Sequence, residues 1–103
     1  MRAKEKRILE RLVEKIKKIV PEAEIILFGS KARGDDTLFS DVDILILVDK
    51  KEKKEEILEV CFQFELEHDI LISPLIRTRD EWNSFPYNVS EIRHFIEEEG
   101  VRL

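Results

Sequence analysis

The segment from Asp41 to Val48, which reads DVDILILV, is the strongest constraint on how this chain can fold. Every residue after Asp43 in this segment is apolar, so a strand formed here has apolar side chains on both of its faces. Such a strand is stable only inside a sheet that is covered on both sides. The segment therefore predicts a sheet with other elements packed against each face.

The rest of the chain supplies helices and strands for such a sheet. The first predicted elements are a helix over 2–20 that stops at Pro21, a strand over 24–28, and a loop over 29–40 with room for a short helix from Lys31. A second strand follows over 41–48, and after a charged loop a helix runs to Glu67. The last predicted elements are a strand over 68–76, a helix that ends before Gly100, and a short strand after it. Pro74 predicts an edge position or a bulge for the third strand. Capping-box spacings predict helix starts at Thr78 and at Asn88. This order predicts one α/β (α+β) domain over residues 1–103, with a small mixed sheet of three or four strands flanked by helices.

Composition argues against several classes of protein. The net charge is −5, which disfavours binding to duplex nucleic acid through the overall field. Cys61 is the only cysteine and lies among apolar residues, so a buried thiol and a cytoplasmic location are expected. No run approaches the roughly 20 apolar residues of a membrane-spanning helix. We therefore expect a cytoplasmic protein that binds neither membrane nor nucleic acid directly.

Two acids stand at the start of the central strand. Asp41 and Asp43 are two residues apart, so their side chains project from the same face. Two neighbouring carboxylates repel each other and are costly to bury without a compensating cation, and Mg²⁺ suits hard oxygen ligands of this kind. Asp69 would join them if the third strand lies beside the second, and three carboxylates could hold two metal ions about 3.5–4 Å apart. The alternative is that Asp41 and Asp43 only mark a solvated strand end.

A Gly-Ser turn precedes these acids and offers a site for phosphate. Gly29 follows a strand directly and permits backbone conformations that other residues resist. Ser30 adds a hydroxyl and a backbone N–H at the start of the next segment. Two better-known phosphate loops are excluded: Gly34 is followed by Asp35 where a P-loop needs lysine, and no G-x-G-x-x-G pattern occurs.

The turn and the acids together form a specific signature. Gly29-Ser30, then ten residues, then Asp41-Val42-Asp43 resembles the motif of the DNA polymerase beta-like nucleotidyltransferase superfamily. The longer string GSKARGDDTLFSDVDILI is similar to the minimal nucleotidyltransferases, or MNT proteins, of bacteria and archaea. The resemblance covers essentially the whole chain and implies the minimal nucleotidyltransferase fold.

The resemblance also implies roles for individual residues. Gly29 and Ser30 would contact the triphosphate of a nucleotide, which is expected to be ATP, and Asp41 and Asp43 would bind Mg²⁺. The family's third acid, which helps to activate the attacking hydroxyl, maps best to Asp69. Two basic residues match the family's loop and would neutralise phosphate charge, with an ordinary surface loop as the alternative: Lys31 and Arg33. Two Mg²⁺ ions are expected in the complete site.

The family further implies a partner. MNT proteins are commonly paired with HEPN-domain toxins, and as antitoxins of type VII systems they transfer AMP from ATP to a tyrosine of the toxin. The chain is short for an acceptor-binding domain of its own, so we expect the acceptor to come from another protein, or from a second copy in a homo- or hetero-oligomer. Two alternatives stay open: an antitoxin that acts by binding alone, and a nucleotidyltransferase with a small-molecule acceptor.

Overall fold

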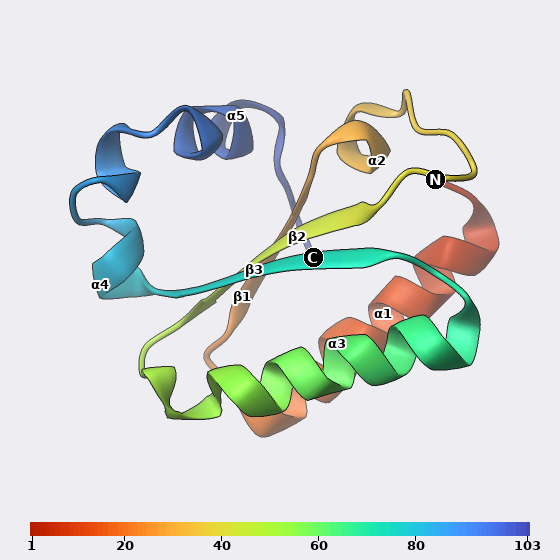
Figure 1. Ribbon diagram of the computed structural model, residues 1–103, viewed down its shortest axis with the longest axis horizontal. Helices are drawn as coiled ribbons and strands as arrows, with labels where there is room; N and C mark the ends of the chain where they lie inside the picture. The colour runs from red at the N-terminus through yellow and green to blue at the C-terminus, as the bar shows by residue number, and fades with distance from the viewer.

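The computed structural model describes the whole chain, Met1 to Leu103, as helices packed against both faces of a four-stranded sheet (Figure 1). The elements are α1 (Ala3–Ile19), β1 (Glu24–Phe28), α2 (Ser30–Arg33), β2 (Val42–Val48), η1 (Lys51–Lys53), α3 (Lys54–His68), β3 (Ile72–Thr78), α4 (Arg79–Trp82), η2 (Tyr87–Val89), α5 (Glu91–Glu99) and β4 (Val101–Arg102). The predicted α/β class with a small mixed sheet is confirmed.

The sheet has the strand order β3-β2-β1-β4. Strand β2 pairs with β1 in antiparallel fashion and with β3 in parallel fashion, and β4 pairs antiparallel with the other side of β1. Strand β2, which begins at Val42 rather than at Asp41, is therefore central, as its two apolar faces require. Pro74 lies in the edge strand β3, as predicted, where its missing N–H breaks no ladder bond to β2.

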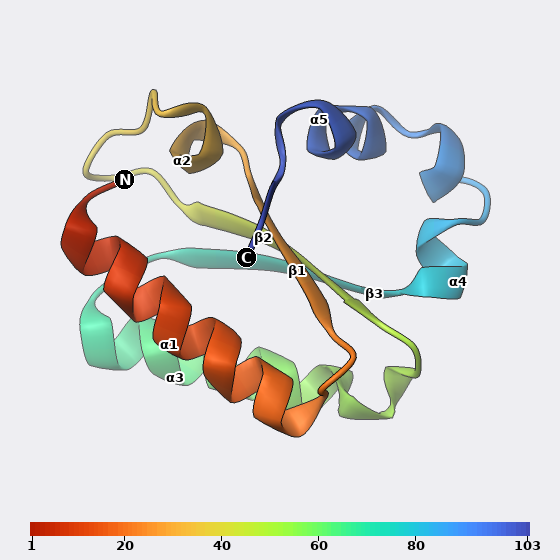
Figure 2. The ribbon, with the colours of Figure 1, turned by 180° about the vertical axis from the view of Figure 1, so that it is seen from behind.

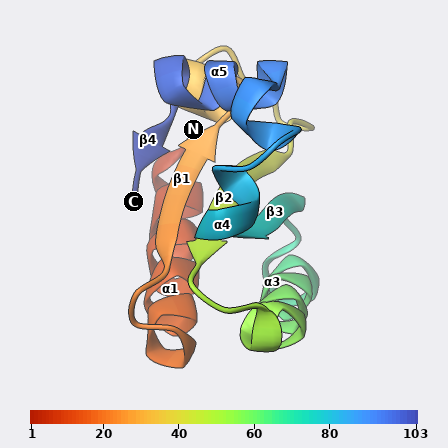
Figure 3. The same ribbon diagram turned by 90° about the vertical axis from the view of Figure 1, so that its left-hand side faces the viewer.

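The two faces of the sheet are covered by different helices (Figures 2 and 3). Helices α1 and α3 lie side by side on one face, whereas α4 and α5 cover the other. Alternate residues of β2 enter two separate apolar clusters. The α1/α3 cluster includes Val42, Ile44, Ile46 and Val48, and the α4/α5 cluster consists of Leu45, Leu47, Trp82 and Ile96. Side chains at odd positions of β2 therefore face α4 and α5.

Two predicted elements begin later in the chain than their sequence patterns suggest. Strand β3 begins at Ile72 rather than at residue 68, because Asp69 ends α3 in a left-handed conformation with φ of 52° and the next residues turn the chain. Helix α5 begins after Ser90 rather than Asn88, because the Ser90 side chain accepts the Arg93 N–H. The capping box at Thr78 is confirmed as the start of α4.

Cys61 is buried in the α1/α3 cluster, as predicted. Burial raises the pKa of its thiol to about 11, so the group stays protonated and unreactive at neutral pH. The helices of this fold include none that combines the length and the apolar character needed to cross a membrane.

The capping box of α4 yields a prediction about acid stability. Glu81 accepts hydrogen bonds from Lys54 Nζ at 2.7 Å and from the Thr78 N–H at 2.9 Å, and these hold the pKa of its carboxyl at about 2, below the ordinary 4.5. The ionised carboxylate therefore stabilises the folded state above pH 4.5, and this contribution is lost as the pH falls toward 2. Because the pair is exposed, we expect Glu81→Gln to lower the free energy of unfolding at pH 7 by about 1 kcal/mol or less.

Urea unfolding at pH 7 and at pH 2 measures this effect. The difference between the Glu81→Gln variant and the wild type should shrink at the lower pH, and Asp80→Asn on the same helix should change neither value by more than about 0.5 kcal/mol. A difference that is the same at both pH values would contradict the role of the Glu81 charge.

Candidate active site

Asp41 and Asp43 lie on the face of the sheet that α4 and α5 cover, at the end where β2 begins. Asp43 stands in β2 opposite Phe28 of β1 and opposite Ser73 of β3. Asp41 precedes β2, and its Oδ2 accepts a hydrogen bond from Ser73 Oγ at 2.7 Å. Since Ser73 and Asp43 share one face, this bond places Asp41 on that face too. The structure thus brings the two carboxylates to the same corner of the sheet.

The turn between β1 and α2 touches Asp43. Gly29 has φ of 75° and ψ of −159°, a conformation that is essentially restricted to glycine. A Cβ atom at this position would overlap Oδ2 of Asp43, so the backbone of the turn lies directly against the carboxylate. Ser30 is the first residue of α2, where a backbone N–H has no acceptor within the helix. The predicted phosphate turn and the acids are therefore neighbours in space.

The pair carries negative charge that the chain only partly compensates. Partial burial, and then the charge of Asp41, raise the pKa of the Asp43 carboxyl above its ordinary value. The Arg33 guanidinium lowers that pKa in part. No group of three or more His, Cys, Asp or Glu side chains is arranged to hold a metal ion. What the site offers is two carboxylates beside a glycine turn, a donor set that suits a hard divalent cation completed by phosphate oxygens.

The prediction that Asp69 lies on a strand beside Asp41 and Asp43 is wrong. Asp69 is the C-cap of α3 and does not belong to β3. It lines a hollow with residues from the start of α1 and the loop before Asp41, among them Lys4 and Phe39. The error arose because the apolar residues after Asp69 look like the start of a strand, although they belong to the turn that leads into β3.

Ser73 occupies the position that we expected for a third acid. It is the residue of β3 that stands opposite Asp43, and its hydroxyl holds Asp41. One usable signal was present in the sequence, the polar residue within the apolar run ILISPLI. The register between β2 and β3 decides which residue of β3 faces the acids, and that register depends on where β3 begins.

The two basic residues of the α2 segment behave differently. Lys31 is buried and forms ion pairs with Glu5 at 2.7 Å and Asp36 at 3.2 Å, so it ties α2 to the start of α1. Arg33 is half exposed and pairs with Asp35 and with Glu99 of α5. Of the two, Arg33 is the cation whose charge reaches Asp43.

The sequence matches known proteins over most of its length. The family model described as "Nucleotidyltransferase domain" matches residues 9–103. Two relatives come from Methanocaldococcus jannaschii. "Putative protein adenylyltransferase MJ0141" is 40% identical over 74 residues, which make up 69% of this chain and 72% of the relative. "Putative protein adenylyltransferase MJ0604" is 37% identical over 73 residues, which make up 66% of this chain and 71% of the relative.

Solved structures share the fold at lower sequence identity. A crystal structure of a toxin–antitoxin MntA–HpeT mutant matches 91% of this chain and 69% of its own, with a TM-score of 0.62 and 18% identity. A crystal structure of a toxin–antitoxin with AMP-PNP matches 90% of this chain and 70% of its own, with the same TM-score and identity. With the family model matched from residue 9 to the last residue, this chain belongs to the nucleotidyltransferase domain family.

Proposed function

We propose that this chain is a Mg²⁺-dependent nucleotidyltransferase that transfers AMP from ATP to a hydroxyl group of a partner protein. Membership of the nucleotidyltransferase domain family supports the reaction class. The names of both M. jannaschii relatives support a protein as the acceptor. The solved structure that shares the fold and carries AMP-PNP supports an adenine nucleotide as the donor.

One observation carries this proposal: the carboxylates of Asp41 and Asp43 share a face of the sheet, and that of Asp43 lies against the backbone of the Gly29 turn. The raised pKa of Asp43 marks charge that a cation would neutralise. We therefore assign Asp41 and Asp43 as Mg²⁺ ligands, and Gly29 and Ser30 as the backbone that lies against the triphosphate. Arg33, which is half exposed beside them, is assigned to the phosphates.

In the proposed reaction the oxygen of the acceptor hydroxyl bonds to the α-phosphorus of ATP. The bond between that phosphorus and the oxygen bridging to the β-phosphate breaks, pyrophosphate leaves with the bonding electrons, and the hydroxyl proton is released. Bound Mg²⁺ would supply charge compensation on the phosphates. The contribution of the chain is positioning: Ser73 holds Asp41, and the lack of a side chain at Gly29 lets the turn lie against Asp43.

We further propose that the acceptor is a tyrosine of an all-helical HEPN-domain toxin and that the chain is the antitoxin of a type VII pair. The resemblance of the signature Gly29-Ser30 to Asp43 to MNT proteins supports this assignment. The two solved structures of the same fold are each described as a toxin–antitoxin, which gives it further support.

A labelling assay tests this proposal. The purified chain is mixed with Mg²⁺, ATP labelled at the α-phosphate, and a HEPN protein from the same genome. We expect label on one tyrosine of the HEPN protein, no label when the γ-phosphate carries the isotope, and none without Mg²⁺. The γ-labelled control separates AMP transfer from phosphorylation.

Two outcomes would overturn the proposal. If no label transfers while Asp41→Asn and Asp43→Asn variants still neutralise toxicity, the chain is an antitoxin that acts by binding. If pyrophosphate is released only with small acceptors such as aminoglycosides, the acceptor class is wrong.

The hydrogen bond between Ser73 and Asp41 leads to a prediction about metal affinity. Removing the hydroxyl in Ser73→Ala frees Asp41 to rotate, and hydrogen-bond partners of metal ligands typically contribute about 10–100-fold to affinity. We expect Mn²⁺ to bind Ser73→Ala at least about 10-fold more weakly than it binds the wild type, as measured by the loss of the free-Mn²⁺ electron paramagnetic resonance signal. Ser73→Thr, which keeps the hydroxyl, should retain most of the affinity, and Ser84→Ala, whose hydroxyl donates to the Asp80 carbonyl instead of an acid of the site, should change nothing. Equal affinity in Ser73→Ala and wild type would contradict a positioning role.

A further inference from the structure

The outer side of α3 carries a row of apolar side chains that the fold leaves uncovered. Leu58, Phe62 and Leu66 are spaced four residues apart and are 52%, 57% and 71% exposed. Residues at this spacing lie on one side of a helix, so the three form a continuous stripe, which we call the α3 stripe. Single exposed apolar residues need no explanation, whereas a contiguous apolar surface is typical of a binding site.

The α3 stripe borders a groove and leads toward the candidate active site. Leu58 and Phe62 line a hollow of about 470 Å³ whose other wall is Ile72 and Pro74 of the edge strand β3. Leu71, which is 56% exposed, immediately precedes that wall. It lines a second hollow, of about 520 Å³, together with Leu38 and Phe39 of the loop before Asp41. The exposed apolar surface therefore runs from α3 to the loop that carries the first of the two acids.

The open edge of β3 is poorly suited to binding another strand. In a strand, backbone groups point alternately toward each side, so the outward-facing residues include Ile72 and Pro74. Pro74 has no N–H, and the Ile72 N–H already donates to Glu65 at 2.8 Å. An added strand would find neither of these donors free. An occupant must therefore pack against the side chains, as a helix laid in the groove does.

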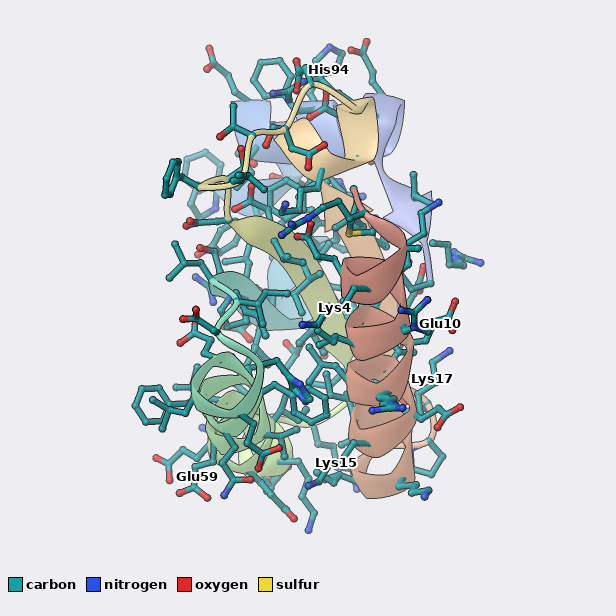
Figure 4. All side chains as sticks on the ribbon, turned by 90° about the vertical axis from the view of Figure 1, so that its right-hand side faces the viewer. Lys4, Glu10, Lys15, Lys17, Glu59 and His94 are labelled. Carbon is teal, nitrogen blue, oxygen red and sulfur yellow. The ribbon has the colours of Figure 1, made fainter.

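The charges around the α3 stripe favour a basic occupant. Glu56 of α3 pairs with Lys53, whereas Glu55 and Glu59 on the exposed side have no ion-pair partner in the chain. Glu59 lines the groove and points away from α1 (Figure 4). Two copies of this chain joined through their α3 stripes would bring these acids together, which disfavours self-association.

We propose that the groove between α3 and β3 binds a partner protein through an amphipathic helix that carries Lys or Arg beside its apolar residues. The groove lies on the α1/α3 side of the sheet and the acids lie on the other side, so a protein bound there reaches the candidate active site around the edge of β3, past the loop before Asp41. This second step rests on the proposed function, whereas binding itself does not.

The first experiment tests binding with a defined probe. A fluorescein-labelled amphipathic peptide of about 20 residues, long enough to be helical, carries Leu on one face and Lys at the flanking positions, and a second peptide has Glu in place of every Lys. By fluorescence anisotropy we expect the Lys peptide to bind the wild type at least tenfold more tightly than the Glu peptide. Phe62→Ser with Leu66→Ser should weaken binding at least tenfold, and Glu59→Lys should reduce the preference for the Lys peptide. Phe95→Ser, which removes an exposed aromatic residue of α5, is the matched control and should bind like the wild type.

Three results would overturn this proposal: no binding of the Lys peptide, equal binding of both peptides, or equal loss in the Phe95→Ser control. A dimer in sedimentation equilibrium that the Phe62→Ser, Leu66→Ser variant abolishes would assign the groove to a second copy instead.

In the labelling assay with the HEPN protein, the same double variant should reduce AMP transfer at least tenfold and leave Mn²⁺ binding unchanged. If the wild type binds the Lys peptide but transfers no AMP, the proposed function is rejected and the groove is still a binding site for a partner.

Discussion

Replacing Asp43 by asparagine is expected to abolish nucleotidyl transfer and, in the absence of metal, to make the folded protein more stable. Partial burial and the charge of Asp41 raise the pKa of the Asp43 carboxyl, so the charged form is unfavourable in the folded state. A raised folded-state pKa favours folding below the ordinary 3.8 and loses that contribution as the pH rises. The asparagine side chain of the variant carries no charge at any pH, so the gain in melting temperature should be present at pH 7 and disappear below pH 3.8.

The loss of activity has a separate cause. An amide is a poor substitute for a carboxylate as a Mg²⁺ ligand, and transfer should fall by at least about 10²-fold. Adding Mg²⁺ should raise the melting temperature of the wild type but not that of Asp43→Asn.

Asp69→Asn is the matched control for this variant. Asn tolerates the left-handed conformation of residue 69, so the substitution keeps the backbone intact. Because Asp69 lies outside β3, we expect its variant to keep transfer within about twofold and to leave the Mg²⁺ effect on melting unchanged. An equal loss in both variants would mean that Asp69 reaches the reacting groups after all.

The parts of this fold that could be predicted from the sequence are those that local patterns determine. The double apolar face of residues 44–48 places β2 at the centre of the sheet, and the capping box at Thr78 starts α4. The signature from Gly29 to Asp43 links a turn and a strand that pair directly, because Phe28 stands opposite Asp43. Contacts between sequence neighbours, and between strands that follow each other in the chain and pair, can be predicted without knowing the rest of the topology.

What could not be predicted from the sequence depends on contacts between distant segments. The pairing of Ser73 with Asp43 depends on where β3 begins. Because a turn follows α3, β3 begins at Ile72 and not at residue 68, the predicted start. Lys31 matched a phosphate-binding position of the family's loop, but its neighbours in space are Glu5 and Asp36. In both cases the partners of a residue are set by tertiary packing rather than by spacing along the chain.

Replacing Gly29 by alanine is expected to damage both the fold and the candidate active site. The backbone at Gly29 is in a region that side chains essentially exclude, which costs about 1–3 kcal/mol. The added methyl group would also overlap Oδ2 of Asp43, so the carboxylate must move. Displacement of a positioned group by about 1 Å can cost about 10²-fold in rate, and we expect transfer to fall by at least that factor. Urea unfolding and the labelling assay measure the two effects.

Gly34→Ala separates general backbone strain from the contact with Asp43. Gly34 also has a positive φ, of 86°, but no atom beyond its two chain neighbours lies within 4 Å of the position that its Cβ would take. It should therefore cost about 1–2 kcal/mol of stability and leave transfer nearly unchanged. A double-mutant cycle of Gly29→Ala with Asp43→Ala then isolates the overlap: because Asp43→Ala removes the atom that the new methyl group meets, the double variant should lose less stability than the sum of the two single variants. Strict additivity would show that the Gly29 turn and the Asp43 carboxylate do not touch, and the assignment of this corner as a combined phosphate and metal site would fail with it.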